Sequence, residues 1–295
     1  MDSFGEGFVA RTVVAGGRKV ACEVGGPAEA PAVLLLHGFP QTRLAWRAVA
    51  ARLSRDYRVV CPDLPGYGES ERLGDGPEAF AKRRTAGHLV EVMREFGHER
   101  FGVVGHDRGA LVATRIALDH PERVDALAVV DVVPTADLWP ALAGVAGVFA
   151  FHLYLLASPP DLPERMIAAD PDVFFGHFLD SWTKVPDAIP APVREHYLRQ
   201  CARPEVILAI CDDYRASAFI DPEHEEADRA AGTSIAAPTL AVWQDPGDMP
   251  LPFDPEVVWS RWAPDLRTLV LPTGHFIPEE APEELAAAVS DLLTH

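Results

Sequence analysis

Residues 101–109 read Phe-Gly-Val-Val-Gly-His-Asp-Arg-Gly, and residues 110–118 continue Ala-Leu-Val-Ala-Thr-Arg-Ile-Ala-Leu. The apolar run predicts a buried strand, and the residues after Gly109 predict a helix. Glycines at both ends of the junction, Gly105 and Gly109, let the backbone crowd its neighbours, which is typical of a strained strand-to-helix turn. Asp107 at its centre is the candidate nucleophile, because a helix N-terminus favours the ionised carboxylate. Its alternative role is a plain helix N-cap, which the glycines and the partner residues below disfavour.

Short β-rich runs alternate with helical segments on both sides of this turn. This alternation predicts a mostly parallel sheet that is covered by helices on both faces. The expected strands are Phe8–Ala15, Arg18–Val24, Ala32–Leu36, Val59–Cys61, Phe101–Val104, Ala126–Val130, Pro238–Trp243 and Thr268–Leu271. The first two are split by Gly16-Gly17 and should form an antiparallel hairpin. Helices are expected in the core at Leu44–Leu53, Glu78–Phe96, Gly109 to about Leu118, and Pro282–Leu293.

The alternation stops after Asp131 and resumes only near Pro238. The residues between them are helical in pattern, rich in proline and aromatic side chains, and contain no convincing buried strand. We therefore expect one core domain formed by residues 1–133 and 231–295. Residues 134–230 are expected to form a helical cap inserted after the sixth strand of that core.

The composition excludes several classes of partner. A net charge of −18 repels nucleic acid and anionic membrane surfaces. The stretch Leu138–Leu156 comes nearest to a membrane span, but Pro140 and His152 interrupt it, so we expect an amphipathic cap helix there. The first 30 residues lack the basic and apolar regions of a signal peptide. The four cysteines form no Cys-x-x-Cys pair, so we expect buried thiols in a reducing cytoplasm, no metal and no cofactor.

A candidate base and two candidate acids follow later strands. His275, in Gly-His-Phe after the last expected strand, stands where a turn of this type places its base. The acid that orients it is either Asp131, at the end of the strand before the cap, or Asp248, in the loop after the next strand. Both loops lie at the carboxyl ends of parallel strands, where ligands bind in open α/β sheets. These patterns alone leave the two acids nearly equal.

An aspartate nucleophile predicts a particular chemistry. It attacks an sp³ carbon that bears a leaving group and forms an alkyl ester, which water activated by the histidine then hydrolyses. Halide displacement and epoxide opening suit this scheme, whereas peptide hydrolysis does not. The loop His37-Gly38-Phe39-Pro40 follows the third strand, and the backbone N–H groups of Phe39 and Arg108 are the candidate oxyanion hole. A cis bond before Pro40 suits this loop, and His37 is expected to hold it in place.

Together these motifs resemble the haloacetate (fluoroacetate) dehalogenases of the α/β-hydrolase superfamily nearly from end to end. The resemblance is carried by residues 37–42 with Trp46, and by residues 63–68, 106–110, 117–121, 131 with 134–135, 213–216 and 274–276. It implies an α/β-hydrolase fold with a helical cap after the sixth strand. The expected partner is a small-molecule substrate. Family members are often homodimers, so the resemblance also suggests a homodimer.

The resemblance also implies residue roles. It assigns nucleophile, base and acid to Asp107, His275 and Asp131. Arg108 would hold the substrate carboxylate, and His152 and Tyr214 of the cap would hold the departing halide.

Two positions depart from the family pattern, both in the expected pocket. A second carboxylate-binding arginine, one helical turn beyond the nucleophile, is replaced by Leu111, and a tryptophan beside the cap histidine is replaced by Leu153. A charge-assisted hydrogen bond from arginine is worth roughly 1.5–3 kcal/mol and a neutral indole bond about 1 kcal/mol. The two replacements therefore remove on the order of 3 kcal/mol from recognition of a small haloacid. We expect a roomier, more apolar pocket and weakened action on fluoroacetate, because fluoride is the poorest leaving halide.

The same residues allow a second interpretation, an epoxide hydrolase. That class shares the aspartate nucleophile, the His-Gly-x-Pro loop and the His–acid pair, and it needs two cap donors to polarise the epoxide oxygen. His152 and Tyr214 would serve, and Leu111 suits an uncharged epoxide better than a carboxylate. The agreement of residues 106–110 and 213–216 with the dehalogenases favours the first interpretation. A binding protein without activity is disfavoured, because it would need neither an intact nucleophile nor an intact base.

Overall fold

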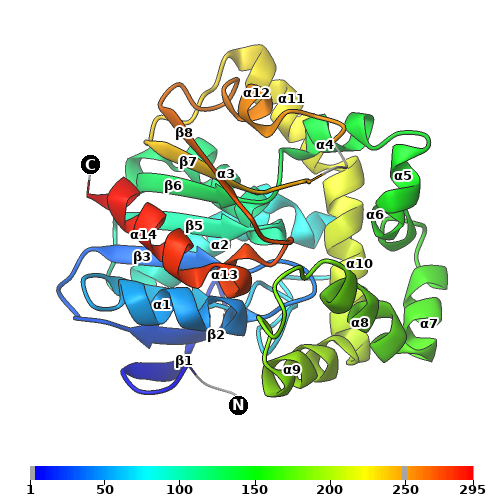
Figure 1. Cartoon of the computed structure of the whole chain (residues 1–295), viewed down its shortest axis with the longest axis horizontal. Helices are drawn as coiled ribbons and strands as arrows, with labels where there is room; N and C mark the ends of the chain where they lie inside the picture. Colours follow the sequence, from blue (N-terminus) through cyan, green and yellow to red (C-terminus); the bar gives the residue numbers. More distant parts are fainter. Residues whose placement is uncertain (1–3, 248–250, 295) are drawn as a thin grey trace.

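A computed structural model describes residues 4–247 and 251–294 and is shown in Figure 1. An eight-stranded sheet runs through the molecule in the order β1-β2-β4-β3-β5-β6-β7-β8. Its strands are Phe8–Ala15 (β1), Arg18–Gly25 (β2), Ala32–Leu36 (β3), Arg58–Pro62 (β4), Phe101–His106 (β5), Val124–Val130 (β6), Thr239–Gln244 (β7) and Leu266–Leu271 (β8). All eight expected strands are present, and they differ from the expectation only by one or two residues at their ends.

The pairing of the strands decides where their ends lie. β1 pairs with β2 and β2 with β4 in antiparallel fashion, and all the other neighbouring strands are parallel. In this register His106 of β5 lies beside Val130 of β6, and Val130 lies beside Val242 of β7. The residues that directly follow β5 and β6, Asp107 and Asp131, therefore meet at one edge of the sheet.

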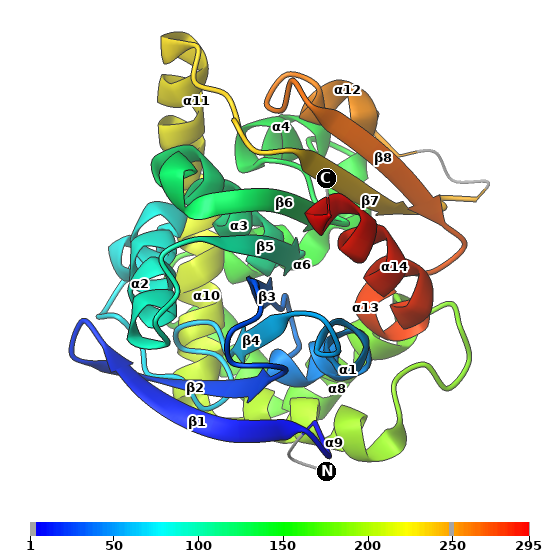
Figure 2. The ribbon, with the colours of Figure 1, turned by 90° about the vertical axis from the view of Figure 1, so that its left-hand side faces the viewer.

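The sheet is buried on both faces. Alternate residues of β3 belong to two opposite hydrophobic cores, as the two-residue period of a strand requires. Helices α2 (Lys82–Glu95) and α3 (Arg108–Asp119) cover one core, and α1 (Arg47–Leu53) and α14 (Pro282–Leu293) cover the other. Figure 2 shows α1 and α14 on one side of the strands and α2 on the other. This is the doubly covered sheet expected from the alternating pattern.

Eight helices connect β6 to β7, and most of them lie to the right of the sheet in Figure 1, with α11 near the top. We refer to this helical connection as the cap. All residues of the connection are described, and none of them forms a strand. The helices are Thr135–Ala141 (α4), Ala146–Phe149 (α5), Phe151–Leu156 (α6), Leu162–Ala169 (α7), Pro171–Ser181 (α8), Ala191–Cys201 (α9), Pro204–Phe219 (α10) and Asp221–Ala231 (α11).

The single amphipathic helix expected over Leu138–Leu156 is wrong. Helix α4 ends at Ala141, and Gly144 then adopts a left-handed conformation with φ of 66°, which ends regular helix because residues with a Cβ rarely occupy this region. The short helices α5 and α6 follow. Among the described residues, no helix combines the length and the apolar character needed to cross a bilayer.

The helix expected over Glu78–Phe96 is also too long. The backbone is extended at Ala81, with ψ of 133°, so that a short 3₁₀ turn precedes α2. The N–H of Lys82, the first residue of α2, donates to the carboxylate of Asp221 at 2.8 Å. The residue that caps the N-terminus of α2 thus belongs to α11, far along the chain. No local sequence pattern predicts this contact.

Candidate active site

Asp107 occupies a strained turn between β5 and α3, with φ of 50° and ψ of −119°. The two glycines of the motif are required by close backbone contacts. A Cβ at Gly105 would lie 2.3 Å from the carbonyl oxygen of Gly109, and a Cβ at Gly109 would lie 2.3 Å from the carbonyl oxygen of Leu36. A non-glycine residue at such a φ costs on the order of 1–3 kcal/mol, which the surrounding fold must supply. In return, the carboxylate of Asp107 stands at the N-terminus of α3, above the edge of the sheet.

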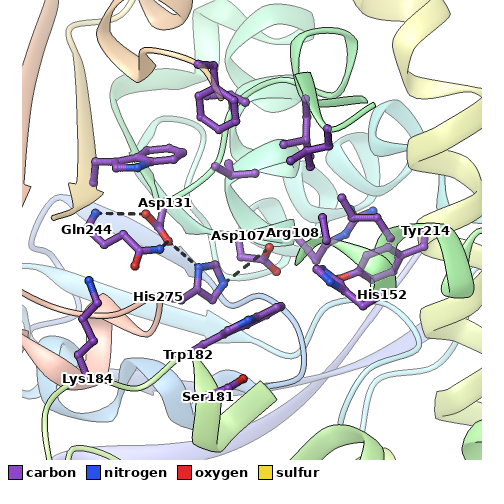
Figure 3. Close-up of a pocket in the computed structure, with 18 residues that line it drawn as sticks. Asp107, Arg108, Asp131, His152, Ser181, Trp182, Lys184, Tyr214, Gln244 and His275 are labelled. Atoms are coloured by element: carbon purple, nitrogen blue, oxygen red, sulfur yellow. Dashed lines mark hydrogen bonds and ion pairs between the residues drawn. The ribbon is translucent and has the colours of Figure 1, made fainter. Parts of the chain in front are cut away.

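His275 lies between the two aspartates that follow β5 and β6 (Figure 3). Its Nδ1 is 2.6 Å from Oδ2 of Asp131, and its Nε2 is 3.9 Å from Oδ2 of Asp107. An ionised carboxylate only accepts hydrogen bonds, so the short contact places the proton on Nδ1 and leaves the lone pair on Nε2. That Nε2 is buried and has no hydrogen-bond partner among the described residues. It is therefore free to accept a proton on the side that faces Asp107.

Asp131 is fixed from a second direction. Like Asp107, it has a positive φ, 55°. Its carboxylate accepts one hydrogen bond from the backbone N–H of Gln244 at 3.2 Å and another from Nε2 of the Gln244 side chain at 2.8 Å. The second acid considered from the sequence, Asp248, lies outside the described residues. The geometry thus supports Asp131 as the partner of His275.

The charges around His275 favour its protonated form. Burial opposes protonation, but the hydrogen bond and charge of Asp131, followed by the charges of Asp107 and Glu280, outweigh it and raise the pKa of His275. The neighbouring His106 ring, 4.7 Å away between centroids, stays neutral because burial and then the charge of His275 lower its pKa. Three carboxylates therefore raise the pKa of His275 against the effect of burial.

The raised pKa of His275 predicts an acid limb in the pH profile of turnover. Only the neutral imidazole accepts a proton, so kcat should rise as the pH passes upward through this pKa and level off above it. If Asp107 forms the ester expected from the sequence, it loses its negative charge, so the pKa that governs kcat should be lower than that of the free enzyme. Steady-state kinetics and an NMR titration of the imidazole check this order. In Asp107→Asn the NMR pKa of His275 should fall, and an unchanged value would contradict the electrostatic argument.

The loop after β3 holds the other oxygen of the Asp107 carboxylate. The N–H of Phe39 donates to Oδ1 of Asp107 at 2.7 Å, and the Phe39–Pro40 bond is cis. A Cβ at Gly38 would lie 2.4 Å from that same Oδ1, so glycine is needed for the carboxylate to approach. His37 is fully buried, with its Nε2 accepting from the N–H of Leu64 at 3.0 Å, and it stands in the loop as a structural residue.

Arg108 is buried and bound to the cap. Its Nε donates to the Asp213 carboxylate at 2.7 Å, its Nη2 donates to the Asp213 carbonyl at 2.9 Å, and its Nη1 donates to the Ser217 hydroxyl at 3.2 Å. The guanidinium lies 4.2 Å from the centre of the Tyr214 ring. Three of its five N–H groups are thus taken, and two remain for a ligand. The carboxylate role expected for Arg108 is therefore open to only part of the guanidinium.

Asp213 also binds donor groups of the core. Its carboxylate accepts from the Tyr67 hydroxyl at 2.9 Å and pairs with the Lys82 ammonium as well as with Arg108. Burial alone would raise the pKa of Asp213, but the charges of Arg108 and Lys82 outweigh it and hold that pKa well below its usual range. Asp213 therefore stays ionised and keeps Arg108 in place.

A cavity of about 280 Å³ opens between the cap and the edge of the sheet that carries Asp107 and Asp131 (Figure 3). Its polar lining is Asp107, Arg108, Asp131, His152, Ser181, Lys184, Tyr214, Gln244 and His275. Its apolar lining is Val132, Val133, Leu138, Leu142, Ala150, Leu153, Trp182, Trp243 and Phe253. A cavity of this volume can hold a substrate larger than a two-carbon acid.

The pocket residues expected from the cap line the cavity, whereas Leu111 of α3, also expected there, lies in the core. His152, Leu153 and Tyr214 line the cavity. Burial, followed by the charges of His275 and Arg108, lowers the pKa of His152 to about 3, so this side chain is neutral near pH 7. Leu111 is 3% exposed, packs in the main hydrophobic core and is absent from the described cavity lining. Its direct contact with substrate, expected from the sequence, is not supported.

Sequence reasoning missed two residues that shape the site. Trp182, just after α8, places its ring 5.0 Å from the His275 ring and 4.9 Å from the His152 ring. Its position depends on how the cap folds, and no local motif reveals it. Gln244 did carry a usable signal, because it is a polar residue at the carboxyl end of a buried parallel strand, like the two aspartates.

A model of the α/β-hydrolase fold family matches residues 31–282 of this chain. The chain therefore belongs to the α/β-hydrolase family, as its sheet topology and its Asp107 turn indicate, and it is an enzyme.

Three known proteins are similar to this chain over most of its length. A fluoroacetate dehalogenase from a Burkholderia species is 38% identical over 98% of this chain and 95% of its own length, which confirms the resemblance to the haloacetate dehalogenases. A soluble epoxide hydrolase from a Corynebacterium species is 28% identical over 85% of this chain and 86% of its own. The solved structure of ALR0039 from Nostoc sp. PCC 7120 has a TM-score of 0.93 at 39% identity and covers 98% of both chains.

Proposed function

We propose that this enzyme hydrolyses its substrate in two steps through an ester on Asp107. The observation that carries the proposal is the arrangement of the Asp107 carboxylate: Phe39 binds Oδ1, while Oδ2 faces the unpartnered Nε2 of His275 inside the cavity. Oδ1 is thereby marked as the future oxyanion and Oδ2 as the attacking atom.

In the first step Oδ2 of Asp107 attacks an sp³ carbon, and the leaving group departs with the bonding electron pair. In the second step His275 takes a proton from water, and the water oxygen adds to the carbonyl carbon of the ester. The N–H of Phe39 stabilises the negative charge on Oδ1. Asp131 stabilises the imidazolium. When the intermediate collapses, the bond between Cγ and the alkylated Oδ2 breaks, the imidazolium returns its proton to that oxygen, and the alcohol leaves. The new carboxyl group gives its remaining proton to solvent, which restores the carboxylate.

We propose dehalogenation of a 2-haloacid as the reaction. The support is the named activity of the Burkholderia relative, together with the two unoccupied N–H groups of Arg108 for a carboxylate. His152 and Tyr214 line the same cavity, where they can donate to a departing halide. The apolar wall around Leu153 favours an acid that carries an apolar substituent over unsubstituted haloacetate.

A substrate panel tests this proposal. We expect chloride or bromide release from chloroacetate, bromoacetate and larger 2-haloacids. Fluoride release from fluoroacetate should be slower by about 10-fold or more, because Leu153 provides no indole N–H for the halide, a bond worth about 1 kcal/mol, and fluoride is the poorest leaving halide. Halide is measured by ion chromatography. Fluoride release as fast as chloride release would contradict the argument from Leu153.

An epoxide hydrolase is the second candidate. It is favoured by the largely apolar cavity wall, by the neutral His152 beside Tyr214 as a pair of uncharged donors, and by the Corynebacterium relative. Styrene oxide in the same panel, assayed by diol formation, decides between the two. Diol formation without halide release would assign the second function and exclude the first.

A further inference from the structure

Glu280 is a buried carboxylate that holds the loop carrying the base. It ends the short helix Ile277–Glu280 (α13), which follows the loop directly. Its Oε2 accepts from the N–H of Gly274 at 2.9 Å, and its Oε1 accepts from the N–H of Phe276 at 3.1 Å. These two amides flank His275 on either side. The conformation of the base loop is thereby fixed by one side chain that is absent from the described cavity lining.

The same carboxylate holds a segment of the cap. Its Oε2 also accepts from the N–H groups of Lys184 and Val185, both at 2.8 Å. Two residues before Lys184, the carbonyl oxygen of Trp182 accepts from the N–H of His275 at 2.8 Å. The cap segment and the base loop are thus joined directly and also through Glu280.

The contact is close enough to exclude a side chain at position 274. A Cβ on Gly274 would lie 2.1 Å from the carbonyl oxygen of Trp182 and 2.9 Å from the backbone nitrogen of Lys184. The other face of the base loop is held as well, because Nε2 of His106 lies 2.8 Å from the carbonyl oxygen of His275.

The two oxygens of the Glu280 side chain accept from all four donors. A carboxylate offers two oxygens and about four acceptor positions, whereas the amide of glutamine offers one oxygen and adds two donors of its own. With glutamine at position 280, at least one of the buried backbone N–H groups would lose its partner, which is costly in a protein interior.

We infer that Glu280 is a positioning residue, which fixes His275 and the cap segment around Trp182 as one unit so that water is activated at the Asp107 ester. The inference rests on the proposed function, because Glu280 acts through the base of that reaction. Glu280 has no contact with the reacting atoms. Its loss should therefore slow hydrolysis of the ester far more than formation of the ester.

Glu280→Gln tests this, with the haloacid of the panel that releases halide fastest. We expect kcat to fall by about 100-fold, as a misplacement of the base by about 1 Å would cause. Halide release in the first turnover should remain close to the wild-type rate, and the intact protein should carry the alkyl adduct during turnover. Amide exchange measured by mass spectrometry should accelerate together in peptides covering residues 182–186 and 272–278.

Two further variants provide the controls. Glu225→Gln removes a carboxylate that likewise accepts a backbone N–H, from Ala136 at 2.6 Å, but away from the base, and it should give no adduct. His275→Gln should accumulate adduct completely. If it does not, the proposed function fails. If His275→Gln accumulates adduct and Glu280→Gln does not, the role of Glu280 fails alone.

Glu280→Asp covers the case in which the glutamine variant does not fold. It keeps the charge but withdraws the carboxylate by one methylene group, so it should show the same excess of adduct to a smaller degree. A folded aspartate variant with wild-type kcat and no adduct would overturn the inference.

Discussion

Asp107→Asn is expected to lower turnover by about 10⁴-fold or more, because a neutral amide oxygen cannot displace a leaving group from carbon. The substitution keeps the shape of the side chain, and the amide oxygen can still accept from Phe39, so the loss is one of nucleophilicity rather than of folding. Halide or diol release measured over hours gives the residual rate. Asp170→Asn serves as the matched control, because Asp170 caps the N-terminus of α8 and asparagine caps a helix equally well.

Loss of turnover alone would also follow if Asp107 merely activated a water molecule. A single turnover of the wild-type enzyme in H₂¹⁸O separates the two roles. If Asp107 is the nucleophile, the oxygen of the alcohol comes from its carboxylate, and the heavy oxygen enters the protein at position 107. Heavy oxygen found only in the first-turnover alcohol would contradict an ester intermediate.

His275→Gln is expected to stop the reaction after one turnover. The carboxylate can still attack, because Phe39 and the turn remain in place, but the group proposed to take a proton from water is then missing. Turnover should fall by roughly 10²–10⁴-fold, the usual contribution of a general base. Mass spectrometry of the intact protein should show one added alkyl group per chain, and peptide mapping should place it on Asp107. Hydroxylamine should release the adduct if it is an ester.

The control for this substitution is His120→Gln, in the loop after α3, which should turn over normally. Two results would contradict the assignment of the base. One is normal turnover by the His275 variant, and the other is loss of halide release without any adduct, which would place His275 in the first step.

The catalytic edge could be predicted from the sequence because each of its features is local. Glycines at fixed distances around Asp107 specify the turn, and short apolar runs specify buried strands whose carboxyl ends must meet in a parallel sheet. The proximity of Asp107, Asp131 and His275 follows from that topology. The acid could not be chosen from the local patterns alone, because Asp131 and Asp248 follow adjacent strands. The resemblance to the haloacetate dehalogenases implied Asp131, and the hydrogen bond from His275 supports that choice.

The helix boundaries and side-chain contacts of the cap could not be predicted, because they depend on contacts between distant segments. Gly144 divides what looks like one helix, and the helix expected from Glu78 begins later because Asp221 caps it from another element. Trp182 reaches the base only because of the way the cap folds over the sheet. Leu111 has the spacing of a pocket residue, but it points into the core. Periodicity identifies helices, but the packing between them decides which side chains meet the substrate.

The ion pairs of Asp213 have a mechanical consequence. Helix α10 belongs to the cap by its place in the chain, yet Asp213 and its neighbour Asp212 bind Lys82, Arg108 and Arg72 of the core. Lifting the cap as a single lid would break several of these buried ion pairs at once. They therefore anchor α10, and through Asp213 the Arg108 guanidinium, to the core.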